Sequence, residues 1–152
     1  MSINNIIILF VIGLFNFNLL AANIYTIESK YLTILASQEK MHYRGNVVLT
    51  ASNFIINSSE LEFIKKTRED LMRFTNLTII QLSKDKKQKL TISGDKAEYF
   101  IKGKFIITGN VKFSDGENSI QAQKITYNSV NRTIEAVQVQ DKQVKVVIKA
   151  NE

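Results

Sequence analysis

The spacing of apolar side chains constrains this chain most, because they recur at every second position beyond residue 23. The stretches 25–27, 47–49, 105–107, 111–113 and 144–148 all follow this period. Short polar breaks rich in Gly, Asn, Asp, Ser and Lys separate them. A period of two is typical of β-strands with one buried face, whereas a helix repeats every ~3.6 residues. The sequence therefore predicts an all-β fold.

Residues 60–73 are the one segment for which a helix could be argued. The polar stretch 67–70 in its middle leaves such a helix without an apolar face. We therefore predict a loop between strands at this place.

An internal repeat runs through the chain. Residues 43–63 overlay residues 107–127 without a gap when the chain is shifted by about 64 positions. Both copies contain Gly-Asn-Val, at 45–47 and at 109–111, with apolar residues at matching positions on either side. Repeated units whose apolar faces no single unit can bury indicate a stacked β architecture.

The repeated Gly-Asn pairs, Gly45-Asn46 and Gly109-Asn110, each lie inside a stretch that alternates like a strand. Glycine within a strand marks a bulge, a bend or a close backbone approach, and Asn tolerates left-handed dihedral angles. We predict that these four residues bend each strand at one level, which gives a sheet folded along a crease with a concave apolar face. The alternative is a hairpin turn in both copies, since Gly-Asn is a permitted two-residue turn.

The N-terminal residues 1–22 carry no charged side chain and include an uninterrupted apolar run followed by Leu-Leu-Ala-Ala. A run of about ten apolar residues is too short to cross a bilayer, which takes roughly 20. It fits a signal peptide, with cleavage expected after Ala21 or Ala22. Alternatives are an uncleaved anchor or a buried apolar strand. The remaining residues 23–152 are enough for one domain, and the chain has no Cys with which to form disulfides.

Residues suited to catalysis are sparse. The single histidine, His42, has no Cys or second His to pair with, and its position in the alternation predicts a solvent-facing side chain. The stretch 115–118 lacks the following ligands and the distal Glu of a calcium loop, and is expected to be a turn. No phosphate loop, zinc spacing or nucleophile elbow is present. We therefore expect a binding or structural protein that is not an enzyme and takes no cofactor or metal.

The net charge of +6 includes a lysine run over residues 84–89 and lysines along the last strand. Lysines on an exposed sheet face and edge discourage aggregation. The same charge could attract an anionic partner such as phosphorylated lipid headgroups. Nucleic acid is not an expected partner of an exported chain.

Four segments together resemble a known family. Residues 25–29 (YTIES) follow the signal peptide, 45–47 (GNV) come next, and 107–111 (ITGNV) precede 123–127 (QKITY). This pattern resembles the OstA-like, LptA-type family, the periplasmic component of the lipopolysaccharide transport bridge. The resemblance covers nearly all of residues 23–152.

The resemblance implies a folded antiparallel sheet, called a β-jellyroll or β-taco, with open ends and an apolar groove for lipid A acyl chains. It implies a periplasmic protein that passes lipopolysaccharide from the inner to the outer membrane without catalysis. It also implies head-to-tail self-association and partners similar to LptC and LptD.

The strand alternation nominates the side chains that would line such a groove, because acyl chains bind by burial against apolar surface. Parity selects an odd-numbered set, and plain core packing would use the same residues. The set comprises Tyr25, Ile27, Val47, Leu49, Leu61, Phe63, Tyr99, Phe105, Ile107, Val111, Phe113, Ile125 and Tyr127, with Val144, Val146 and Ile148 extending it into the last strand.

Other interpretations stay open at this point. A neutral N-terminal region leaves a retained, LptC-like anchored component of the same bridge possible. The length could supply an outer-membrane β-barrel of about eight strands, although Trp is absent and lysines are spread through the strands. A structural or adhesive β-repeat protein with no lipid site is the third alternative.

Overall fold

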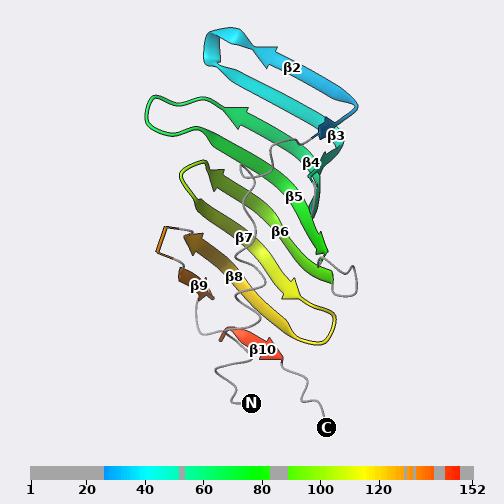
Figure 1. The fold of residues 1–152 in the computed structure, drawn as a ribbon, viewed down its shortest axis with the longest axis vertical. Coiled ribbons are helices and arrows are strands. Elements are labelled where there is room, and N and C mark those ends of the chain that lie inside the picture. The colour runs from blue at the N-terminus through cyan, green and yellow to red at the C-terminus, as the bar shows by residue number, and fades with distance from the viewer. Residues whose placement is uncertain are drawn as a thin grey trace.

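The computed structural model describes residues 26–51, 54–82, 89–128, 130–131, 133–138 and 143–147. It contains one antiparallel sheet of ten strands (Figure 1). They are β1 (Thr26–Glu28), β2 (Tyr31–Leu35), β3 (Lys40–Thr50), β4 (Phe54–Ile64), β5 (Leu71–Leu82), β6 (Lys89–Phe100), β7 (Lys104–Ser114), β8 (Ser119–Asn128), β9 (Thr133–Val137) and β10 (Lys145–Val147), with one 3₁₀ turn, η1 (Ala36–Gln38), between β2 and β3. The predicted all-β fold is confirmed.

Several sequence predictions concern residues outside those ranges. They are the signal peptide (1–22), the groove residues Tyr25 and Ile148, and most of the 84–89 lysine run. Within the described ranges, no helix has the length and apolar character needed to cross a membrane.

The long strands β3 to β8 pair with their sequence neighbours in hairpins, and the ends of this stack are built differently. β1 and β2 both pair with β3, β1 against residues 48–50 and β2 against residues 40–44. At the other end, β9 and β10 both pair with β8, β9 against 124–128 and β10 against 119–121. Each end strand is therefore split in two, and in Figure 1 the stack runs from β2 at the top to β10 at the bottom.

Positive φ angles and shifts in pairing register occur at neighbouring positions of adjacent strands, along a line that crosses the sheet between β1 and β2 at one end and between β9 and β10 at the other. Gly45-Asn46 in β3 and Gly109-Asn110 in β7 lie inside continuous strands, where the pairing register shifts. Their φ angles are +79° and +49°, and +80° and +49°. In β5, which lacks the Gly-Asn pair, Asn76 has a φ of +51° at the same level. Neither Gly-Asn pair forms a hairpin turn. We call the line of register shifts and positive φ angles across the sheet the crease.

The crease divides the sheet into two halves. The β1 wing holds β1, β10 and the strand segments 47–50, 54–58, 77–82, 89–94, 111–114 and 119–122; the β2 wing holds β2, β9 and the segments 40–44, 60–64, 71–75, 96–100, 104–108 and 124–128. One hydrophobic cluster contains side chains of both wings.

The predicted odd-numbered residues face inward where the structure describes them, but the inward positions are not all odd-numbered, because their parity changes at the crease. Within β4, β5, β6 and β8, inward residues on the two sides of the crease are three apart, so their parity changes; examples are Phe74 and Leu77 in β5. Within β7 they are four apart, at Ile107 and Val111, because the Gly-Asn bulge adds a residue. Inward positions therefore switch to even numbers in parts of several strands.

The loop predicted over residues 60–73 was too wide. β4 continues to Ile64 and β5 begins at Leu71, so only residues 65–70 connect the strands. The alternation in the flanks of the loop was the stronger signal.

Candidate functional site

The inward face of the sheet is built from rows of side chains that run across the strands. In the β2 wing, one inward residue of each strand pairs with an inward residue of the adjacent strand, and these pairs form a row that runs from β2 to β9. This rim row comprises Ile34, Met41, Phe63, Met72, Tyr99, Phe105, Tyr127 and Ile134. Its middle is aromatic and sulfur-containing, and Tyr99 packs edge-on to Phe105 with ring centroids 5.9 Å apart.

The β1 wing carries a matching row with a different composition. It comprises Ile27, Leu49, Ile56, Ile79, Ile92, Phe113, Ile120 and Val146. All members except Phe113 are aliphatic. The two wings therefore offer a mostly branched-aliphatic surface on one side and an aromatic rim on the other.

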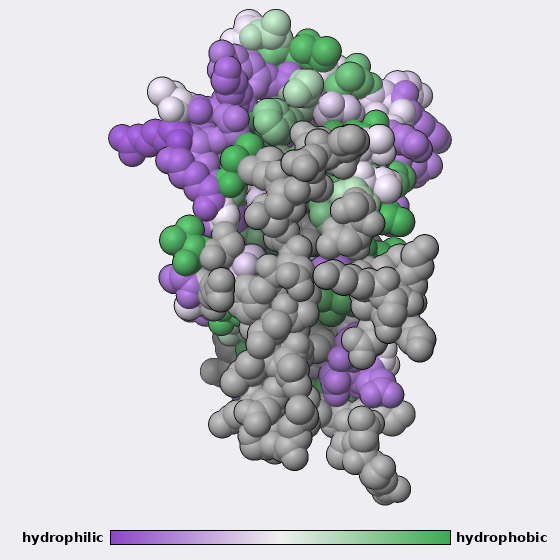
Figure 2. Space-filling model, viewed as in Figure 1, coloured by the Kyte–Doolittle hydropathy of each residue, from purple (hydrophilic) through white to green (hydrophobic). Residues whose placement is uncertain are grey.

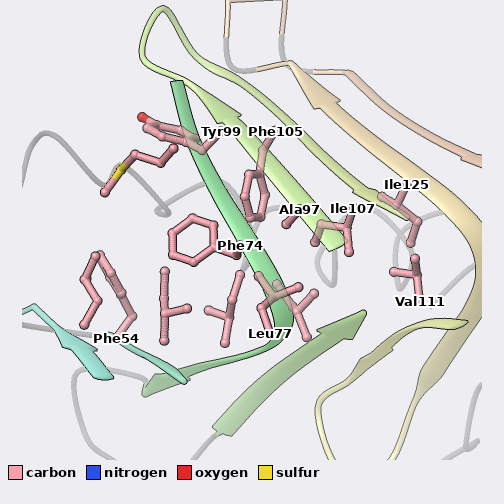
Figure 3. Close-up of a cluster of buried hydrophobic side chains, with 14 of the residues drawn as sticks. Phe54, Phe74, Leu77, Ala97, Tyr99, Phe105, Ile107, Val111 and Ile125 are labelled. Atoms are coloured by element: carbon pink, nitrogen blue, oxygen red, sulfur yellow. The ribbon is translucent and has the colours of Figure 1, made fainter. Parts of the chain in front are cut away.

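Side chains of both rows meet in one buried cluster. Figure 3 shows Phe74 near its centre, with Tyr99 and Phe105 on one side and Leu77 on the other. Phe74 is 0% exposed. Burial raises the pKa of the Tyr99 hydroxyl, and the neighbouring Tyr127 adds to the shift. The buried polar residues among the described ones are Ser58 and Gln81, so the interior is almost entirely apolar.

The structure brings together every described member of the predicted groove set. Nine are buried: Val47, Leu49, Leu61, Tyr99, Phe105, Ile107, Val111, Phe113 and Ile125. Ile27, Phe63, Tyr127 and Val144 are partly buried against the cluster. Val146 lies in β10 at the edge of the inward face and is exposed.

Sequence reasoning missed other members of the cluster. They are Phe54, Ile56, Met72, Phe74, Leu77, Ile79, Ile92, Ala97 and Ala122. The alternation in 71–82 could have nominated those in β5, had a one-residue shift been allowed at Asn76, the residue with positive φ.

The inward face is most open at the β2 end. Leu32 and Ile34 pair with Tyr43 and Met41, so they lie on the inward face, yet they are 50% and 64% exposed. In Figure 2, hydrophobic side chains lie at the upper end of the molecule, the end that β2 occupies in Figure 1. The apolar surface thus continues to the last strand of the sheet without being covered.

The outward face of the β2 wing is polar and ion-paired. Lys40 and Arg73 both contact Glu62, and Arg73 also contacts Glu98, so four neighbouring strands are linked. Burial raises the pKa of Glu62, but the hydrogen bond and charge of Lys40, with the charges of His42 and Arg73, outweigh it and hold this pKa below its usual value.

His42 lies on this outward face, as the alternation predicted. Its Nε2 lies 2.9 Å from a carboxylate oxygen of Glu60. This contact gives the only histidine of the chain a structural partner on the neighbouring strand.

Asp115 closes the turn between β7 and β8. Its carboxylate accepts the backbone N–H groups of Glu117 and Asn118 at 2.9 and 2.7 Å, and the Asn118 side-chain amide at 2.9 Å. Burial raises the pKa of Asp115, but these hydrogen bonds outweigh it and lower the pKa. Across the described ranges, no group of three His, Cys, Asp or Glu side chains is placed to hold a metal ion.

Comparison with known protein families identifies the family of this chain. Residues 26–133 match the family described as the LptA/(LptD N-terminal domain) LPS transport protein. The chain belongs to this family. The match spans the strands from β1 to the start of β9, and therefore both wings and the crease.

A solved structure shares the LptA-type fold. It is LptH, the LptA homologous periplasmic component of the conserved lipopolysaccharide transport device from Pseudomonas aeruginosa. It superimposes with a TM-score of 0.69 at 14% sequence identity, covering 84% of this chain and 96% of that one. A search of curated proteins found no match. Family membership makes the chain an LptA-like lipopolysaccharide transport component, and the family is described by transport and not by catalysis.

Proposed function

We propose that this chain is a periplasmic carrier that holds the acyl chains of lipopolysaccharide against its inward face and passes the lipid from the inner to the outer membrane. The observation that carries the proposal is the continuity of the inward face. Apolar rows run through every strand of both wings, and the rim row of the β2 wing ends in an exposed apolar side chain on β2.

An apolar face of this kind suits transport because its attraction is not directional. Burial of a methylene group stabilises by ~0.8 kcal/mol wherever along the face it occurs. A lipid can therefore move along the rows while exchanging one set of contacts for a similar one. No proton transfer or covalent step is needed.

The proposed groove lining is the set nominated from the sequence, Tyr25 included, together with the inward residues that the register adds. Most of the members that the structure describes pack against one another in one hydrophobic cluster. An acyl chain that enters from the open β2 end would replace contacts between side chains by contacts of the same apolar kind. We propose that Gly45-Asn46 and Gly109-Asn110 set the bend that separates the wings.

The split ends of the sheet suit the proposed partners. β1 and β2 form one edge and β9 and β10 the other, so each end presents backbone groups that a further strand could pair with. We propose head-to-tail association of copies through these edges, and equivalent contacts with LptC-like and LptD-like proteins. Export by residues 1–22 as a signal peptide completes the proposal.

Site-specific photocrosslinking in cells that make lipopolysaccharide tests the carrier role. A photoreactive residue would replace Phe105, which is 5% exposed and faces inward, and in a control Lys112, which is exposed on the outward face of the same strand. We expect a lipid adduct at position 105 and none at 112. Adducts at neither position would refute the carrier, and adducts at 112 alone would place the lipid on the other face.

A further inference from the structure

The connections at the rim of the β2 wing are held together by hydrogen bonds. Residues 65–70 join β4 to β5, and residues 101–103 join β6 to β7. The backbone N–H of Ile101 donates to the carbonyl of Asp70 at 3.2 Å, and that of Lys102 donates to Oε1 of Glu69 at 2.7 Å. These bonds fix two connections that are distant in sequence side by side.

Another bond extends the same edge toward β3. The N–H of Lys65 donates to the carbonyl of Glu39, at the end of η1, at 3.0 Å. Three connections of the β2 wing thus form one continuous backbone edge. All of them lie on the left side of the sheet in Figure 1.

In the connections 65–70 and 101–103, the acidic and basic side chains have different surroundings. Glu69 accepts the Lys102 N–H and Asp70 accepts the Lys66 N–H at 3.3 Å, so both carboxylates bind backbone within the rim. The cations are exposed, and none of them takes part in an ion pair within the described ranges. They are Lys65, Lys66, Arg68 and Lys102 in the connections and Lys104 at the start of β7, and we call them the cationic lip.

The lip directly adjoins the aromatic part of the rim row. Phe63 lies two residues before Lys65, Tyr99 three before Lys102, and Phe105 directly after Lys104. Figure 2 shows hydrophilic side chains projecting from the upper left margin, on the side where Figure 1 has the connection between β4 and β5. A lipid lying on the rim row would therefore have its polar end next to these cations.

We infer that the cationic lip binds the phosphate groups of the lipid's headgroup, and that this fixes which end of the lipid lies at the rim of the β2 wing. The inference rests on the proposed carrier function. Arginine and lysine bind phosphate by charge-assisted hydrogen bonds, which are stronger than neutral ones. Because Glu69 and Asp70 already accept backbone N–H groups, and no cation of the lip takes part in an ion pair within the described ranges, a phosphate need not displace a carboxylate from these cations.

The test compares two variants of the full chain that lose the same charge. The lip variant carries K65Q, K66Q, R68Q and K102Q; Gln keeps the backbone N–H groups that hold the connections together. The control carries K96Q, K112Q, K124Q and K145Q, which are exposed lysines on strands. Binding is measured for three probes: lipid A with two phosphates, the same lipid after removal of its phosphates, and phosphatidylglycerol vesicles.

We expect the lip variant to bind the phosphorylated lipid about tenfold more weakly than the unaltered chain, as four exposed ion pairs would give together. Binding of the dephosphorylated lipid should be unchanged, and the control variant should bind both as the unaltered chain does. Added salt should narrow the difference between lip variant and unaltered chain.

Each other outcome overturns the inference in a distinguishable way. Equal loss in both variants would mean a diffuse effect of net charge. Normal binding of both lipids by the lip variant would refute the lip and leave the carrier function standing. Lip-dependent binding to the vesicles, without any dependence on the lipid A phosphates, would assign the lip to a membrane surface. Failure of the unaltered chain to bind either lipid would refute the carrier function itself.

Discussion

Replacement of Gly109 by alanine should be costly because the added Cβ would collide with Asp95 on the neighbouring strand. Gly109 has a φ of +80°, and a Cβ built on it would lie 2.4 Å from Oδ2 and 2.8 Å from Cβ of Asp95 on β6. Rotation of the Asp95 side chain could relieve the first contact but not the second, since Cβ is fixed to the backbone. The strands β6 and β7 would have to move apart at the crease.

The cost of Gly109→Ala adds up from three contributions. The left-handed conformation costs an L-residue about 1–2 kcal/mol. Overpacking against Asp95 Cβ adds about 1–3 kcal/mol. Loss of the hydrogen bond from Asn110 Nδ2 to Asp95 Oδ2, 3.0 Å long and exposed, adds up to about 1 kcal/mol. We expect the free energy of unfolding to fall by about 2–6 kcal/mol.

Gly116→Ala is the matched control. Gly116 has a φ of +98°, but nothing lies within 4 Å of a Cβ built there. This variant should lose only the conformational contribution, about 1–2 kcal/mol. Urea denaturation followed by far-ultraviolet circular dichroism measures both, with equal m-values showing that the same surface unfolds.

A double variant separates the clash from the backbone conformation. Asp95→Gly removes the Cβ that Gly109→Ala would meet, so the two changes together should cost less than the sum of the single costs. If Gly109→Ala and Gly116→Ala lowered the free energy of unfolding equally, the reasoning would be refuted, because the contact with Asp95 would then add no cost.

Three further predictions concern the interior and the outward face. Phe74→Ala should lower the free energy of unfolding by about 3–5 kcal/mol, since Phe74 is 0% exposed, whereas Ile106→Ala on the outward face of β7 should cost clearly less in the same urea titration. The pKa of Glu62 is lower in the folded chain than its ordinary value of 4.5, so the ionised Glu62 stabilises the fold fully above pH 4.5 and this stabilisation is lost as the pH falls below it. The difference in unfolding free energy between the unaltered chain and Glu62→Gln should therefore shrink on acidification, and a constant difference would contradict this. The pKa of Tyr99 is raised above its ordinary value of 10.0, so just above pH 10 the hydroxyl ionises in the unfolded chain but not in the folded one, and the fold loses stability there. Tyr99→Phe should reduce this loss of stability at alkaline pH. An unchanged loss would exclude Tyr99 as its source.

The all-β architecture was predictable because alternation is a local signal. The Gly-Asn pairs were visible for the same reason, since they recur at one place in a repeated unit. The register shift in β6 could not be predicted from the sequence, because β6 has Gly94-Asp95 at this level and not the repeated Gly-Asn pair. Parity arguments assume a regular pleat, and each bulge breaks that assumption.

Features that depend on pairing between strands could not be read from the sequence. The links of Lys40, Glu62, Arg73 and Glu98 arise from the registers of three hairpins. The cationic lip likewise depends on a hydrogen bond between Lys102 and Glu69, which lie 33 positions apart. The predicted groove set contains nine of the eighteen buried members of the cluster, because burial follows the local alternation, and it missed the other nine.

The central claim is that acyl chains lie on the inward face, and neighbouring isoleucines allow a direct test. Ile56, Ile79 and Ile107 face inward, while Ile55, Ile80 and Ile106, each next to one of them, face outward. The methyl groups would be labelled for NMR and a lipid A carrying a spin label on an acyl chain added. The account predicts strong paramagnetic broadening of the inward methyl signals and little of their outward neighbours. Equal broadening of both sets, or broadening of the outward set alone, would contradict it.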